Sequence, residues 1–151
     1  MGPIKKSLIK AGIGAMGLLS AASASSTANA QDVSNEINNI MAGVTAVKAG
    51  AEHRSLEIRA AFLNEPIQFR VPDWIQSNPR MLANYNGGLG CVEQAFNREA
   101  KAILPDRNDP SFATAGDIAA QRAGATCKMA AAQMGKDKLD QLQRKVLPSP
   151  R

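Results

Sequence analysis

The sequence predicts a small all-α protein, a helical bundle pinned by one disulfide and carrying a short extended connector near residues 67–71. Apolar residues recur at three- and four-residue steps over long stretches, which is the spacing of one face of an α-helix. Only one short stretch alternates apolar and polar residues as a β-strand does. The 151-residue chain has two cysteines, Cys91 and Cys127, and each lies in a segment that is predicted to be helical.

The first part of the chain, residues 1–30, has the features of a secretory signal peptide. Positive charges precede a short apolar run, Ala11–Leu19, and small residues follow it up to Ala28-Asn29-Ala30. We expect cleavage before Gln31. The alternative is a retained membrane anchor, but a spanning helix needs roughly 20 apolar residues and this run is about half as long. We therefore expect a mature chain that does not span a membrane and is periplasmic or secreted.

Residues 31–147 are predicted to form a single helical domain, and residues 148–151 a flexible tail. Removing residues 1–30 lowers the number of Lys and Arg residues from 18 to 15, while Asp and Glu stay at 13, so the net charge falls from +5 to +2. Nucleic acids and anionic lipids usually bind clustered Lys and Arg. Neither is an expected partner of the mature chain.

The core of this domain is expected to be thin, because alanine supplies much of its apolar content. The aromatic residues are few: Phe62, Phe69, Trp74, Tyr85, Phe96 and Phe112. Two cysteines in an exported chain favour a disulfide, so Cys91 and Cys127 are predicted to be bonded. Closing a loop of this length contributes about 4 kcal/mol in the chain-entropy model. That is a large part of a typical stability of about 5–15 kcal/mol.

Residues 34–63 are predicted to be helical, either as one long helix or as two helices joined near Gly50. Asp32 or Ser34 is the expected cap at its start, and Asn64 is expected to end it. The apolar residues along one face of this segment are Val33, Ile37, Ile40, Met41, Val44, Val47, Ala51, Ile58 and Phe62.

The stretch Ile67–Val71 alternates apolar and polar residues between two prolines, but no other stretch offers a strand to pair with it. We expect an extended connector that packs Ile67, Phe69 and Val71 onto the helices. The alternative is an arm that adds to the edge of a sheet in another protein. These three residues are therefore candidate partner-binding residues.

Asn78-Pro79 predicts a helix start, with Asn as the cap and Pro at the first helical position. Gly87 is expected to stop this short helix in a left-handed conformation, and the next helix is expected from about Gly90 to Leu104. Cys91 would then lie near a helix N-terminus.

A polar loop is expected at Pro105–Ser111, with Thr114 capping the helix that follows. This helix has a face of small residues that lets another helix approach closely, and Cys127 lies in the middle of it. Beyond Gly135, a stripe of apolar residues indicates that this helix continues or that a last helix follows. The stripe either packs on the protein's own core or binds a partner. The stripe consists of Leu139, Leu142 and Val146.

His53 is the only histidine of the chain and lies among charged residues, so we expect it to face solvent. A metal site usually needs three or four ligands, and one histidine without free thiols does not supply them. We therefore expect no metal ion and no cofactor. The one nucleophile worth weighing is Cys91, because a helix N-terminus lowers the pKa of a thiol.

These observations favour an exported, non-enzymatic helical protein that acts through protein–protein contacts. Its expected partner is another exported or envelope protein. The chain either belongs to an assembly for secretion, conjugation or a surface appendage, or binds and restrains another exported protein. The alternative is a small exported thiol or redox enzyme that uses Cys91. The oligomeric state does not follow from the sequence.

Overall fold

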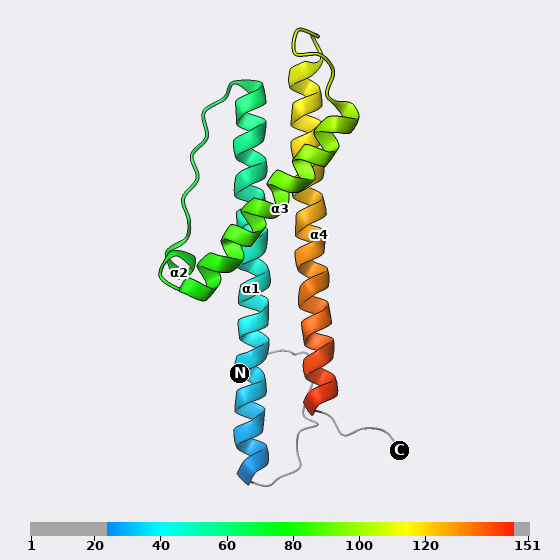
Figure 1. Ribbon diagram of the computed structural model, residues 1–151. Coiled ribbons are helices and arrows are strands. Elements are labelled where there is room, and N and C mark those ends of the chain that lie inside the picture. The colour runs from blue at the N-terminus through cyan, green and yellow to red at the C-terminus, as the bar shows by residue number, and fades with distance from the viewer. Residues whose placement is uncertain (1–23, 147–151) are drawn as a thin grey trace. The chain divides into compact units, whose positions relative to one another are not determined.

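The computed structural model describes residues 24–146, and their side chains from residue 30 onward. This part of the chain contains four helices, three of them long (Figure 1): α1 (Ala24–Leu63), α2 (Asp73–Gln76), α3 (Pro79–Ile103) and α4 (Phe112–Val146). The chain divides between Asn38 and Asn39 into two units. The packing below is that of the second unit. The predicted all-α bundle is confirmed, whereas most of the predicted signal peptide and the predicted tail lie outside the described residues.

The first predicted helical segment is one continuous helix, α1, and does not break at Gly50. In the full chain α1 begins at Ala24, so Asp32 and Ser34 lie inside it and neither caps its start. The predicted end is confirmed. Asn64 adopts a left-handed backbone with φ of 55°, the conformation in which Asn and Gly commonly terminate helices.

Helices α1 and α3 cross with their backbones in contact at two glycines. A Cβ atom added to Gly50 of α1 would overlap the carbonyl oxygen of Tyr85. A Cβ atom added to Gly88 of α3 would overlap the carbonyl oxygen of Val47 and lie 2.8 Å from the nitrogen of Ala51. Only glycine permits this separation of the two helices.

This crossing explains why the predicted helix stop at Gly87 is wrong. Helix α3 runs through Gly87 and Gly88 without interruption, and within residues 24–146 no glycine has a positive φ. Each interior glycine costs a helix about 1 kcal/mol relative to alanine. Tertiary packing supplies most of the stability of helices in proteins, and here the contact with α1 outweighs that cost.

The start of α3 is as predicted. The side chain of Asn78 accepts hydrogen bonds from the backbone nitrogens of Arg80 at 3.0 Å and Met81 at 3.3 Å, and Pro79 is the first helical residue. The loop after α3 is also confirmed. Helix α4 begins at Phe112, before the predicted cap Thr114, and continues through Gly135 to Val146.

Cys91 of α3 and Cys127 of α4 lie at disulfide-bonding distance, with their sulfur atoms 2.06 Å apart and their Cα atoms 6.0 Å apart. Cys127 belongs to a small core between α1, α3 and α4, with buried Ala51, Val92, Ala95 and Ala123. A second core joins α1 to α2 and α3, with buried Ala46, Ile75, Met81 and Tyr85. Alanine supplies three of the five buried residues of the first core, as the composition predicted, whereas the second is built mainly from Ile75, Met81 and Tyr85.

Between α1 and α2 the chain runs back beside α1 as an extended segment (Figure 1). Phe69 and Val71 pack against the second core, while Ile67 stays exposed. The connector prediction is thus confirmed, although Ile67 is less buried than expected. The segment ends at the one-turn helix α2, which places Ile75 in the core and leaves Trp74 exposed.

Candidate functional site

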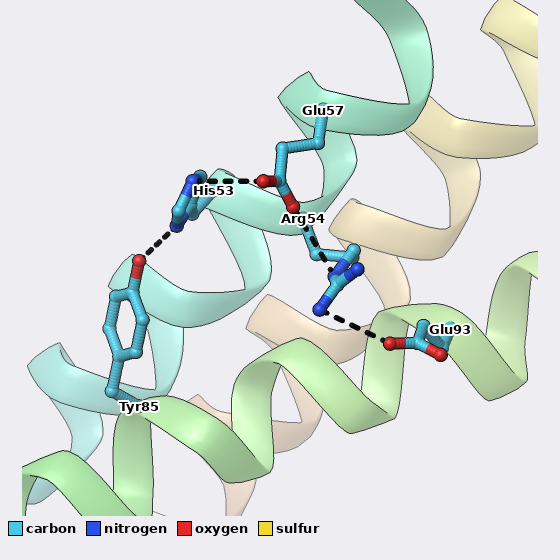
Figure 2. Close-up of polar contacts among 5 residues, drawn as sticks. All are labelled: His53, Arg54, Glu57, Tyr85 and Glu93. Atoms are coloured by element: carbon cyan, nitrogen blue, oxygen red, sulfur yellow. Dashed lines mark hydrogen bonds and ion pairs between the residues drawn. The ribbon is translucent and has the colours of Figure 1, made fainter. Parts of the chain in front are cut away.

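The most connected group of polar side chains is centred on His53 of α1. Its ring stacks on Phe69, with centroids 4.0 Å apart and an angle of 11° between the ring planes. Its Nδ1 is hydrogen-bonded to the hydroxyl of Tyr85, and its Nε2 lies 3.4 Å from Oε2 of Glu57 (Figure 2). The side chain is only 19% exposed. The prediction of a solvent-facing histidine is therefore wrong.

The neighbours of His53 fix which ring nitrogen carries the proton when the ring is neutral. A carboxylate only accepts hydrogen bonds, so the Nε2 that faces Glu57 is the donor. Nδ1 then accepts, and the hydroxyl of Tyr85 donates to it. This chain of bonds links α1 to α3, while the stacked Phe69 adds the connector to the same cluster.

Tyr85 is kept in its protonated form. Burial raises the pKa of its hydroxyl, the nearby Glu57 carboxylate raises it further, and Arg54 partly opposes them. The order carboxylate, imidazole, hydroxyl resembles that of a catalytic triad. A nucleophile needs access to substrate and a lowered pKa or an activating base, whereas Tyr85 is 2% exposed. The arrangement is suited to holding α1, α3 and the connector together.

Arg54 extends this cluster about two turns further along α3, to Glu93, as Figure 2 shows. Its Nη2 lies 3.2 Å from Oε1 of Glu93, and its Nε lies 3.5 Å from Oε1 of Glu57. That Nε is buried and makes no hydrogen bond within residues 24–146. The Glu57 carboxylate therefore faces both His53 and Arg54 on its own helix.

A second set of polar contacts joins α1 to α4. Arg59 Nε donates to Oδ1 of Asp117 at 2.7 Å, and Ser55 Oγ donates to the carbonyl oxygen of Ala120 at 2.9 Å. Lys128 is paired with Glu52. Many of the charged residues on the middle of α1 are thus engaged in contacts between helices.

The cysteine pair lies outside this cluster. Cys91 is well inside α3 and not near a helix N-terminus, so the prediction that the helix dipole acts on it is wrong. Cys127 is 1% exposed, and neither cysteine of the chain is free. A sulfur held in a disulfide is not the thiolate that nucleophilic chemistry requires.

The predicted partner-binding residues fall into two separate groups. Phe69 and Val71 are used within the chain, against His53 and the second core, whereas Ile67 is 39% exposed. In the last turns of α4 lies the second group, half-buried and part of neither core cluster: Leu139, Leu142 and Val146.

Sequence reasoning missed two features of this region. One is the stacking of His53 between the connector and α3, which depends on a crossing point set by Gly50 and Gly88. The other is Trp74, the only tryptophan of the chain, which is 44% exposed. The sequence signal for this feature was the position of Trp74 directly after Pro72-Asp73. Pro and Asp commonly begin helices, so a short helix carrying Trp74 could have been predicted there.

Two further observations concern metal binding and membrane spanning. Among residues 24–146, His, Cys, Asp and Glu side chains do not gather in any group of three or more suited to hold a metal ion. In the same range, every helix is too short or too polar to cross a membrane. Comparison of the chain with models of protein families, with curated proteins and with solved structures found no match.

Proposed function

We propose that this chain is an exported helical protein that acts by binding another exported or envelope protein, within an assembly for secretion, conjugation or a surface appendage. The observation that carries the proposal is the exposure of large apolar side chains in the segment of the chain that joins α1 to α3. Ile67 is 39% exposed and Trp74 is 44% exposed. Tryptophan is one of the residue types enriched at the energetic centres of protein interfaces.

Export is supported by the charged, apolar and small-residue regions of residues 1–30. Cleavage before Gln31 would cut within α1 as it stands in the full chain. Asp32 or Ser34 would then lie at the new helix start, where either side chain can cap exposed backbone N–H groups. The N-terminal sequence of the protein recovered from the periplasm or the medium tests this step; a chain that still begins at Met1 would contradict it.

The binding proposal is tested by photo-cross-linking in the exporting cell. A photoreactive amino acid replaces Ile67 or Trp74 in the full chain, and the matched control replaces Met129, an apolar residue of α4 that is 71% exposed. We expect adducts with the same protein from positions 67 and 74, and none from position 129. No adduct at either position, or the same adducts at all three, would overturn the proposal.

A further inference from the structure

The backbone of the connector is open to hydrogen bonding. Within residues 24–146, no hydrogen bond joins an N–H or C=O group of Ile67–Val71 to another residue. The chain is bonded on both sides of this stretch: Glu65 donates to the carbonyl of Ala60, and Pro72 accepts from Ile75. Five consecutive extended residues therefore present unpaired peptide groups, the feature by which a strand edge recruits another strand.

The side chains of this stretch alternate as those of a strand do. Phe69 and Val71 face the helices, where they pack against the second core. Gln68 and Arg70 are exposed, and the Arg70 side chain is 83% exposed. A two-stranded ribbon is marginal by itself and becomes stable when it packs against a helix. The connector already has that support on one face.

The two prolines set the length of the open edge. Proline has no backbone N–H, so Pro66 and Pro72 limit strand pairing to Ile67–Val71. At about 3.3 Å per residue, these five residues offer an edge roughly 17 Å long. That length matches the short strands that bind by addition to a sheet edge.

We propose that Ile67–Val71 accepts an extended segment of the partner protein as an added β-strand. This inference rests on the proposed function and specifies how the partner is recognised. Main-chain hydrogen bonds to the connector provide affinity, and pockets for alternate side chains provide specificity. The exposed Ile67 and Trp74 are the apolar groups available to such a segment.

The test uses the two edges of the connector. Successive N–H groups of a strand point to opposite edges, so Q68P removes a donor from one edge and I67P a donor from the other. The matched controls Q68A and I67A shorten the same side chains and keep the donors. Neither N–H is bonded within the described residues, so we expect all four variants to melt as the wild type does.

The probe is an array of seven-residue peptides that alternate Val or Ile with Thr, Lys or Glu. We expect the full chain to bind a subset of these peptides. A bound peptide should slow the hydrogen exchange of the amides of residues 67–71 at least about tenfold, which corresponds to 1.4 kcal/mol. An added strand occupies one edge, so one proline variant should bind at least about tenfold more weakly than its alanine control and the other should not.

Several outcomes would overturn the added strand. They are an array with no bound peptide, unchanged amide exchange, and proline variants that bind as tightly as their controls. A wild-type dimer that Q68P or I67P dissociates would assign the edge to a second copy and also overturn it. In each case, cross-links to one protein from positions 67 and 74 would leave the proposed function standing.

Discussion

Gly50 of α1 lies directly against the carbonyl oxygen of Tyr85 of α3, with no room for a side chain between the two helices. This contact sets the position of α3 on α1. It thereby brings the hydroxyl of Tyr85 to the ring of His53. One turn further along α3, it brings Gly88 against the carbonyl oxygen of Val47. The polar cluster and the helix crossing are consequences of the same close approach.

Replacing either glycine of the crossing should destabilise the fold. G50A and G88A place a methyl group against backbone atoms that cannot rotate away, unlike a flexible side chain. We expect each to lower the free energy of unfolding by about 1–3 kcal/mol or more, the usual cost of overpacking. Chemical denaturation monitored by circular dichroism measures the change.

The controls are G87A and G90A on the same helix, where an added Cβ would meet nothing within 4 Å. In an open helical position alanine is better than glycine, so we expect each control to stabilise the protein by about 0.5–1 kcal/mol. Equal effects of G50A and G87A would mean that the two helices do not approach as closely as described.

The Cys91–Cys127 bond should contribute much of the stability. With 36 residues of sequence separation, the chain-entropy model gives a loss of about 4 kcal/mol when both cysteines become alanine. We expect native mature protein to show no reactive thiol, and unfolded, reduced protein to show two. A reactive thiol in the native protein would instead favour the alternative function, a thiol enzyme.

Stability should fall at high pH because of Tyr85. Its pKa in the folded protein is raised above the ordinary value of 10.0, so above about pH 10 the unfolded chain loses this proton before the folded one does. The stabilisation is complete below the ordinary pKa and is lost as pH rises through the folded value. Free energies of unfolding measured from pH 8 to 11 should show the decline.

Y85F separates this effect from the titration of lysines in the same pH range. The variant keeps the buried ring and removes the hydroxyl, so it should lose about 1 kcal/mol near neutral pH through the missing bond to His53. Above about pH 10 its stability should then decline less steeply than that of the wild type. Parallel curves for the two proteins would show that Tyr85 does not titrate differently in the folded state.

Local sequence signals were sufficient to predict the structure wherever one residue type determines the conformation of the backbone. Asn78-Pro79 predicted the start of α3, Asn64 the end of α1, and alternation between prolines the connector. The two cysteines, taken with the signal peptide expected in residues 1–30, predicted the pair that joins α3 to α4. Each of these features depends on neighbours within a few positions or on composition.

Features that depend on distant residues were not predictable in this way. Gly87 has the local character of a helix stop, yet the next residue, Gly88, packs on α1 and the helix continues. His53 lies in a charged stretch, and only the crossing of α1 and α3 reveals that Phe69 and Tyr85 cover it. Nothing in the spacing of these residues along the chain encodes that contact.

The ion pair between Arg59 and Asp117 should contribute measurably, unlike the one between Arg70 and Asp73. The first joins α1 to α4 at 2.7 Å with side chains 35% and 19% exposed, whereas the second is 83% and 82% exposed. A double-mutant cycle with R59A and D117A should give a coupling of about 0.5–1 kcal/mol that weakens in salt. The same cycle on R70A and D73A should give no measurable coupling, because solvent screens that pair. Equal couplings would mean that α4 does not hold Asp117 against Arg59 in solution.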